Sequence, residues 1–160
     1  MKFSEHTQLD QELVLEFFLT LSRIEFALKV TKYAKGNTSR AKPDWDKFGR
    51  DIKDHFNIKR DEKLEASCNY YLKLPPQKQI LKNNKLTWVD AIPEGLSDPE
   101  LLLVYVRRVR NNLFHGGKYN IQAPDETERN EELLKSGIRI IHEALKCELN
   151  VWGAYQQASI

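Results

Sequence analysis

The sequence predicts an all-α fold, a compact bundle of about five helices in one domain spanning residues 1–160. Apolar residues recur at helical spacing over most of the chain, and several Gly and Pro residues fall between these periodic segments, where helices end. A chain of 160 residues is also long enough to bury one hydrophobic core. These observations favour a single helical domain.

The longest periodic segment runs from about Leu9 to Lys35 and predicts a long N-terminal helix that ends at Gly36. Its apolar residues occupy two opposite sides, so this helix is expected to lie centrally or in an interface. Glu25 projects beside the apolar surface and is predicted to be half buried. Since a buried carboxylate needs a cationic partner, Glu25 is expected either to form a structural ion pair or to hold Arg107 or Arg110 in place.

The middle of the chain predicts two more helices, over residues 43–56 and 61–72, with aromatic core residues in the first. The helical period then disappears within residues 77–96. This insertion is either irregular or a small hairpin that turns at Asn83 and Asn84. Three lysines give it a modest basic patch, which is interpreted as a solvated loop with an RNA-contacting arm as the alternative: Lys78, Lys82 and Lys85.

The next helix is expected to begin at Ser97 or Asp98 and to end at Gly116-Gly117. One side of it carries the predicted core stripe, Leu102, Tyr105, Val106, Val109 and Leu113, and the other carries Arg107, Arg108, Asn111 and His115. Apolar residues interleave with this polar side, so a second helix or a second copy of the protein should cover it. A last long helix is expected from about Glu126 to Leu149, with close approach by a neighbouring helix at Gly137.

Composition limits the classes of function. A net charge of +2 does not by itself indicate nucleic-acid binding, so any RNA contact requires local clustering of cations. Cys68 and Cys147 are expected to be reduced, without a disulfide or metal role. No zinc pattern, phosphate loop or dinucleotide fingerprint occurs, so no metal and no other cofactor is expected. The absence of a secretory signal or a long apolar run predicts a cytoplasmic protein with no membrane association.

The segment Arg110-Asn111-Asn112-Leu113-Phe114-His115 resembles the Arg-Asn-x-x-x-His motif of the HEPN superfamily. This resemblance implies a compact helical domain that cleaves RNA without metal. It also implies a homodimer, in which two motif helices meet and form one active-site cleft. Gly117 departs from some toxin members of the family, which carry a Tyr there that a partner nucleotidyltransferase modifies, so regulation by that kind of antitoxin is not expected.

The motif residues match the needs of metal-free RNA cleavage, which are a proton acceptor for the 2′-OH, charge stabilisation at phosphorus and a proton for the leaving 5′ oxygen. Arg110 is predicted to bind the scissile phosphate and His115 to move the proton, while Asn111 orients His115 or a phosphate oxygen. The expected products carry 2′,3′-cyclic phosphate and 5′-OH ends. Further substrate-binding candidates are Arg107, Arg108, Asn112 and Lys118.

Three functions stay open at this stage. The first is a metal-independent endoribonuclease, such as a toxin or phage-defence effector restrained by an antitoxin or another regulatory protein. The second is a non-catalytic HEPN-like module that binds a nucleotide, RNA or a partner protein in the same cleft. The third is a helical interaction protein in which Arg110 pairs with Glu25 and His115 caps the end of its helix.

Overall fold

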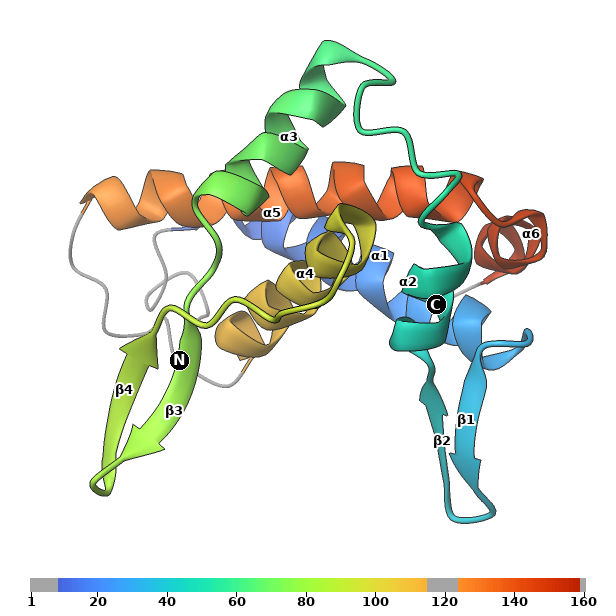
Figure 1. Ribbon diagram of the computed structural model, residues 1–160, viewed down its shortest axis with the longest axis horizontal. Coiled ribbons are helices and arrows are strands. Elements are labelled where there is room, and N and C mark those ends of the chain that lie inside the picture. The colour runs from blue at the N-terminus through green and yellow to red at the C-terminus, as the bar shows by residue number, and fades with distance from the viewer. Residues whose placement is uncertain (1–8, 115–123, 159–160) are drawn as a thin grey trace.

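The computed structural model describes residues 9–114 and 124–158, apart from the side chains of residues 124 and 125. Within these ranges the chain forms six helices and two small antiparallel hairpins (Figure 1). In chain order the elements are α1 (Gln11–Lys29), β1 (Ala34–Asn37), β2 (Arg40–Pro43), α2 (Trp45–Ile52), α3 (Glu62–Lys73), β3 (Lys78–Lys82), β4 (Lys85–Val89), α4 (Asp98–Phe114), α5 (Pro124–Lys146) and α6 (Leu149–Gln157).

The prediction of an all-α fold is therefore wrong, because two two-stranded sheets accompany the helices. The hairpin considered for residues 77–96 is present as β3 and β4, and it turns at Asn83 and Asn84. These two residues have φ values of 51° and 57°. Asn tolerates this left-handed conformation well, and two-residue hairpin loops require it.

The β1–β2 hairpin replaces the expected end of the first helix. That helix was expected to end at Gly36 and instead ends at Lys29. The hydroxyl group of Thr31 donates to the carbonyl of Ala27 at 2.9 Å, which caps the helix end. Gly36 lies inside β1 with a φ of +131°, and a Cβ atom there would collide with the carbonyl oxygen of Arg40. Gly36 is therefore a requirement of this tight hairpin.

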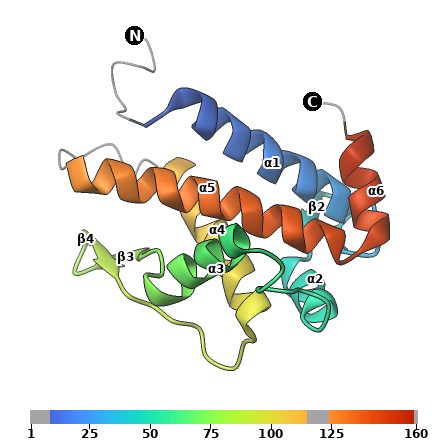
Figure 2. The ribbon, with the colours of Figure 1, turned by 90° about the horizontal axis from the view of Figure 1, so that it is seen from above.

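The core is centred on α1 and α5, which lie side by side and run in the same direction (Figure 2). Near their first turns, the backbone N–H of Asp10 donates to the carboxylate of Glu131 at 3.1 Å. Further along, a Cβ atom on Gly137 would lie 2.8 Å from side-chain atoms of both Phe17 and Tyr71. The predicted close approach of a neighbouring helix at Gly137 is confirmed.

One hydrophobic cluster joins the described parts of all six helices. The helices after α1 lie near their predicted positions, although α2 ends at Ile52 and Phe56 is buried beyond the helix end. The C-terminal tail adds α6, which packs on α1 and α5. None of the helices in the described ranges combines the length and the apolar character needed to cross a membrane.

The position of α4 decides where the motif residues lie. Its N-terminus forms as expected, because the carboxylate of Glu100 accepts hydrogen bonds from the backbone N–H and the hydroxyl of Ser97, at 3.0 and 2.6 Å. The helix then packs against α2, α3 and α5. Four residues of the predicted core stripe are buried, and the fifth, Leu113, is partly buried: Leu102, Tyr105, Val106 and Val109. The arginines of α4 are therefore left on its outer face.

Candidate nucleic-acid interface

A groove of about 850 Å³ follows the outer face of α4. Figure 1 shows both hairpins projecting from the same side of the molecule, with α4 between them. One wall includes residues 40–43 of β2, and the other includes Lys78 and Gln79 of β3. The motif residues contributed by α4 are Arg107, Arg108, Arg110, Asn111 and Asn112. The fold thus brings these predicted site residues together in one concave surface.

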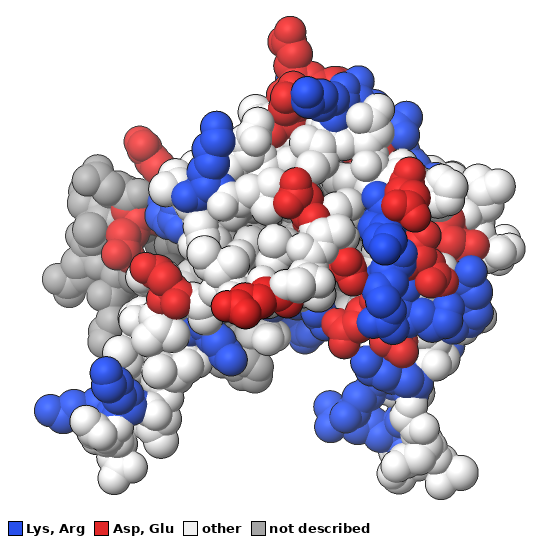
Figure 3. All heavy atoms as spheres, viewed as in Figure 1, with Lys and Arg blue, Asp and Glu red and all other residues white. Residues whose placement is uncertain are grey.

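Positive charge dominates this groove. Among its described lining residues, Glu25 is the one acid, and seven are basic: Lys29, Arg40, Lys42, Lys78, Arg107, Arg108 and Arg110. The hairpin segments 34–43 and 78–89 each contain three basic residues and no acidic residue. On their projecting parts, Figure 3 shows Lys and Arg and no Asp or Glu. A chain with a net charge of only +2 therefore concentrates cations locally, as nucleic-acid binding requires.

Two of the groove arginines pair with carboxylates. Arg110 donates from Nη2 to Oε1 of Glu25 at 2.9 Å, and the two side chains are 34% and 25% exposed. The expected half-burial of Glu25 and its need for a cationic partner are confirmed, and of the alternatives left open the partner is Arg110. Arg107 donates from Nη2 to Oδ1 of Asp46 at 3.1 Å. A guanidinium has five N–H donors, so one carboxylate orients each arginine without saturating it.

Arg108 is held differently. It donates from Nη1 to the backbone carbonyl of Pro76 at 2.9 Å, and its guanidinium lies 5.2 Å from the ring centroid of Tyr105. Burial lowers the pKa of Arg108 from its ordinary value. In the described part of the chain no carboxylate pairs with it, so Arg108 contributes uncompensated positive charge to the groove.

The two motif asparagines occupy different environments. Asn111 is exposed in the groove, where a phosphate oxygen could reach it. Asn112 is buried and donates from Nδ2 to the backbone carbonyl of Gln77 at 2.8 Å. This bond ties α4 to the segment before β3 and gives Asn112 a structural task. Its substrate-binding role stays a prediction.

Three polar atoms of groove-lining residues are buried without a hydrogen-bond partner among the described residues. They are Nε of Arg110, Nε1 of Trp45 and Nε2 of Gln79. All three are N–H donors, and leaving a buried donor unpaired costs about 1–3 kcal/mol. Because these atoms are buried, they are not accessible to a ligand, and the anion-binding chemistry of the groove rests on its seven basic residues.

His115, which is predicted to transfer the proton, lies outside the described residues. The structure describes α4 as far as Phe114, so His115 and the substrate-binding candidate Lys118 are not placed, and neither is Gly116-Gly117. The spacing of Arg110 and His115 corresponds to roughly 140° around a straight helix. Their joint action on one phosphate stays a prediction.

An apolar surface adjoins the C-terminal end of the described part of α4. Phe114 packs edge-on against Phe18 of α1, with ring centroids 5.4 Å apart, yet these residues are 46% and 42% exposed. Leu15 and Phe26 of α1 are also exposed, at 56% and 47%. Leu15 and Phe26 are roughly 20° apart around the helix but about three turns apart along it, so these two and Phe18 do not form one patch. We call Phe18 and Phe114 the α1–α4 apolar surface.

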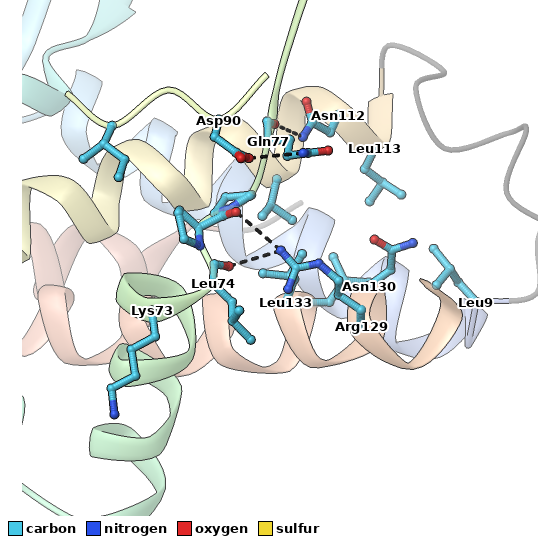
Figure 4. Close-up of a pocket in the computed structure, with 15 residues that line it drawn as sticks. Leu9, Lys73, Leu74, Gln77, Asp90, Asn112, Leu113, Arg129, Asn130 and Leu133 are labelled. Carbon is cyan, nitrogen blue, oxygen red and sulfur yellow. Dashed lines mark hydrogen bonds between the residues drawn. The ribbon is translucent and has the colours of Figure 1, made fainter. Parts of the chain in front are cut away.

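A second cavity, of about 520 Å³, lies against another side of α4 (Figure 4). Its walls are largely apolar and come from α4, α5 and the segment between α3 and β3. Arg129 donates from Nη2 to the carbonyls of Leu74 and Pro75, at 3.1 and 3.4 Å, and Gln77 donates to Asp90 at 3.1 Å. Most of its polar groups therefore serve the local structure, unlike the cations of the groove.

The chemistry of metal and thiol sites is not assembled in the described ranges. There, no three His, Cys, Asp or Glu side chains come close enough together to hold a metal ion. Both cysteines are free thiols, and burial raises the pKa of Cys68 to about 12 and that of Cys147 to about 11. These groups stay protonated near neutral pH, which makes them poor nucleophiles.

Several groove residues were missed by the sequence analysis. Lys29, Arg40 and Lys42 reach the groove from α1 and β2, and Trp45 had been assigned to the core alone. The composition of segment 34–43 could have indicated Arg40 and Lys42, because this segment is basic, contains no acidic residue and is not buried in the core.

Comparisons with protein-family models, curated proteins and solved structures gave no significant match. The likeness to HEPN domains therefore rests on the motif residues of the sequence alone.

Proposed function

We propose that this protein binds RNA in the groove between its hairpins and cleaves it without a metal ion. The observation that carries the proposal is the position of Arg107, Arg108, Arg110 and Asn111 in a groove with seven basic residues and one acidic residue among its described lining. Such a surface attracts a polyanion mainly through its phosphates. Arg110 and Asn111, from the motif that resembles a ribonuclease signature, thus lie in a local concentration of cations.

In the proposed reaction Arg110 binds the non-bridging oxygens of the scissile phosphate and stabilises the added negative charge in the transition state. The 2′ oxygen attacks phosphorus as its proton is removed, and the bond to the 5′ oxygen breaks as that oxygen gains a proton. His115 performs one of these proton transfers. Asn111 orients His115 or a phosphate oxygen. The products carry 2′,3′-cyclic phosphate and 5′-OH ends.

Glu25 has a supporting role in this proposal. Its bond of 2.9 Å to Nη2 of Arg110 fixes the guanidinium group while other donors stay available for phosphate. As the one acidic residue among the described lining residues, Glu25 also repels phosphate. It therefore contributes to the geometry of catalysis at the expense of binding strength.

A homodimer completes the proposed site. One histidine per chain supplies a base or an acid, and a second copy supplies the other. The α1–α4 apolar surface supports this assembly, because Phe114 exposes apolar area directly before His115 in the sequence and packs against the exposed Phe18. An antitoxin or another regulatory protein would inhibit the enzyme by covering the same surface or the groove.

A second candidate function is a non-catalytic module that binds RNA, a nucleotide or a partner protein. The Arg110–Glu25 pair favours it, because a paired arginine is already partly neutralised, as in a structural ion pair. In that case Arg110 would still contribute to binding, and His115 would contribute little.

Cleavage of a labelled structured RNA in excess chelator tests the proposal. Wild type is compared with His115→Ala and Arg110→Ala, and His55→Ala serves as a matched control because His55 is an exposed histidine beyond the end of α2. We expect wild type and the control to cut the RNA and leave cyclic phosphate ends, and both motif variants to lose cleavage. Circular dichroism and solution mass establish that the variants fold and assemble equally.

Each of the other outcomes would support a different function for this protein. Cleavage by His115→Ala at the wild-type rate would exclude the proposed mechanism. Tight RNA binding without cleavage by wild type would favour the non-catalytic module. Absence of both binding and cleavage would leave the Arg110–Glu25 pair as a structural feature of a helical interaction protein.

A further inference from the structure

The second cavity, of about 520 Å³, differs from the groove in the chemistry of its walls. Nine of its fifteen described lining residues are Leu, Ile, Val or Pro. Its inner wall includes Val109 of α4 together with Leu133 and Leu134 of α5, and all three are buried. The volume lies in the range of pockets that hold small organic molecules. Packed helices therefore offer this cavity to the apolar part of a small ligand.

One polar side chain on the wall of this cavity lacks a partner. Asn130 of α5 is only 8% exposed, and its carboxamide forms no hydrogen bond within the described ranges. Figure 4 shows this carboxamide pointing from α5 toward Leu113 of α4, into the cavity. By contrast, the other buried asparagine of the cavity, Asn112, donates to the carbonyl of Gln77 at 2.8 Å. A buried carboxamide without a partner destabilises the fold, and a ligand with matching polar groups would remove that cost.

The charged residues of the cavity do not offer a site for an ion. Arg129 already donates to two backbone carbonyls, at 3.1 and 3.4 Å, and Asp90 accepts from Gln77 at 3.1 Å. Lys73 is exposed, and Figure 4 shows its side chain directed away from Asn130. Burying an unpaired charge costs far more than burying a neutral polar group. The chemistry of the walls therefore selects a neutral ligand.

We propose that this cavity binds a neutral, mainly apolar small molecule with an amide whose N–H and C=O lie side by side, as in a lactam. A carboxamide has an acceptor oxygen and an N–H donor, so Asn130 forms two hydrogen bonds with such an amide, one in each direction. The apolar part of the molecule packs on Val109, Leu133 and Leu134. This inference goes beyond the proposed function and does not depend on it, because Asn130 does not line the groove.

Titration of the full chain with three probes, followed by the NMR signals of its side-chain carboxamides, tests this proposal. The probes are carbostyril, which is a flat bicyclic lactam, coumarin, which is the lactone of the same shape without the N–H, and a carboxylate derivative of carbostyril. The test variant Asn130→Leu keeps the side-chain volume and removes the polar atoms. The control is Asn150→Leu, since Asn150 is an exposed asparagine on α6 that donates to Glu148.

We expect wild type to bind carbostyril roughly tenfold more tightly than coumarin and to shift the signal of Asn130, because the lactone cannot donate to its carboxamide. Asn130→Leu should bind the two neutral probes within about twofold of each other, and the carboxylate should bind most weakly to every protein. Without ligand, Asn130→Leu should raise the Tm by at least about 2 °C, because an unpaired buried amide is removed. The Asn150→Leu control should match wild type in each measurement.

A second variant tests the location of the ligand. Leu74 is 52% exposed at the edge of the cavity, so Leu74→Trp fills part of the space without disturbing the core. This variant should keep the wild-type Tm and lose binding of both neutral probes. Normal binding by Leu74→Trp would place the ligand elsewhere and overturn the inference.

The remaining outcomes also decide the matter. A lower Tm in Asn130→Leu would show that the carboxamide has a partner within the chain, and tighter binding of the carboxylate would contradict a neutral ligand. Equal affinity of wild type for carbostyril and coumarin, or no binding of either, would likewise overturn the inference. None of these measurements involves RNA, so their failure would leave the proposed function intact.

Discussion

Two faces of α4 differ sharply in how their side chains are satisfied. On the inner face, Leu102, Tyr105 and Val106 are buried in the common core with α2, α3 and α5. On the outer face, Arg108 lacks a carboxylate partner in the described part of the chain, and Nε of Arg110 is buried without a hydrogen-bond partner there. The same helix is thus well packed on one side and electrostatically incomplete on the other.

This difference separates stability from binding within a single helix. Apolar burial on the inner face stabilises the fold, whereas like charges and unpaired donors on the outer face destabilise it. An anion in the groove would reduce the repulsion among these like charges. Substitutions on the two faces should therefore have effects of different kinds.

The largest expected effect comes from Leu102→Ala on the inner face. Leu102 is fully buried, and such a truncation removes apolar contacts and leaves a cavity, at a cost of about 2–5 kcal/mol in the free energy of unfolding. Urea denaturation followed by circular dichroism measures this loss. RNA affinity per folded molecule should stay at the wild-type value. A loss below about 1 kcal/mol would show that the inner face is less tightly packed than its burial indicates.

Charge reversal in the groove should weaken RNA binding and leave the stability of the fold nearly unchanged. Lys42→Glu combined with Lys78→Glu is expected to weaken RNA binding at least about tenfold and to reduce the salt dependence of binding by about one phosphate contact per lysine. The free energy of unfolding should change by less than about 0.5 kcal/mol. Anisotropy titrations at several salt concentrations measure both binding effects. Lys59→Glu with Lys63→Glu, at exposed positions that do not line the groove, is the matched control.

Substitutions of Glu25 separate charge from geometry. Glu25→Gln keeps an oxygen that accepts from Arg110 but removes a negative charge from the groove, so RNA affinity should rise about threefold, with a stability loss of no more than about 1 kcal/mol. Glu25→Ala should lower the cleavage rate, because Arg110 is then no longer held. Binding and single-turnover cleavage, measured on the same RNA, distinguish the two effects. Equal behaviour of both variants would remove the positioning role of Glu25.

The smallest effect is expected at His142 of α5, which belongs to neither face. Its ring lies 6.3 Å from that of Tyr155, and burial lowers its pKa from the ordinary value of about 6.5. Below pH 6.5 the unfolded chain therefore binds a proton more readily than the folded chain, and stability falls as the pH decreases. Urea denaturation at pH 7.5 and 5.5 should show a smaller decrease for His142→Gln. If the free energy of unfolding decreases equally in wild type and His142→Gln, groups other than His142 cause the loss of stability at low pH.

The helices could be predicted because their signals are local. The core stripe of α4, the Ser97–Glu100 pair at its start and the small residue Gly137 all express contacts within a few residues or a simple steric need. The β3–β4 turn was accessible for the same reason, since adjacent Asn residues favour positive φ. Apolar and polar residues do not alternate in segment 34–43, so the hydrophobic pattern did not predict that it pairs as β1 and β2.

In the candidate site, too, the residues related by local spacing could be predicted and those brought together by tertiary packing could not. Arg107, Arg110 and Asn111 could be assigned to one surface because helical geometry relates them directly. Lys29 and Arg40 join that surface through tertiary packing between segments that are distant in sequence, and no spacing rule encodes such a meeting. The Glu25–Arg110 pair could be anticipated since a half-buried carboxylate restricts its partners to nearby cations.

The side-by-side arrangement of α1 and α5 has a consequence for how the chain acquires its structure. The hydrogen bond between Asp10 and Glu131 spans 121 positions, and contacts this distant in sequence slow folding because a long loop must close before they form. During synthesis α1 leaves the ribosome long before α5 does, so α5 cannot cover the apolar residues of α1 until it has been synthesised. Glu25 and Lys29 belong to α1, so the packing of α1 on α5 also sets the position of these two groove residues.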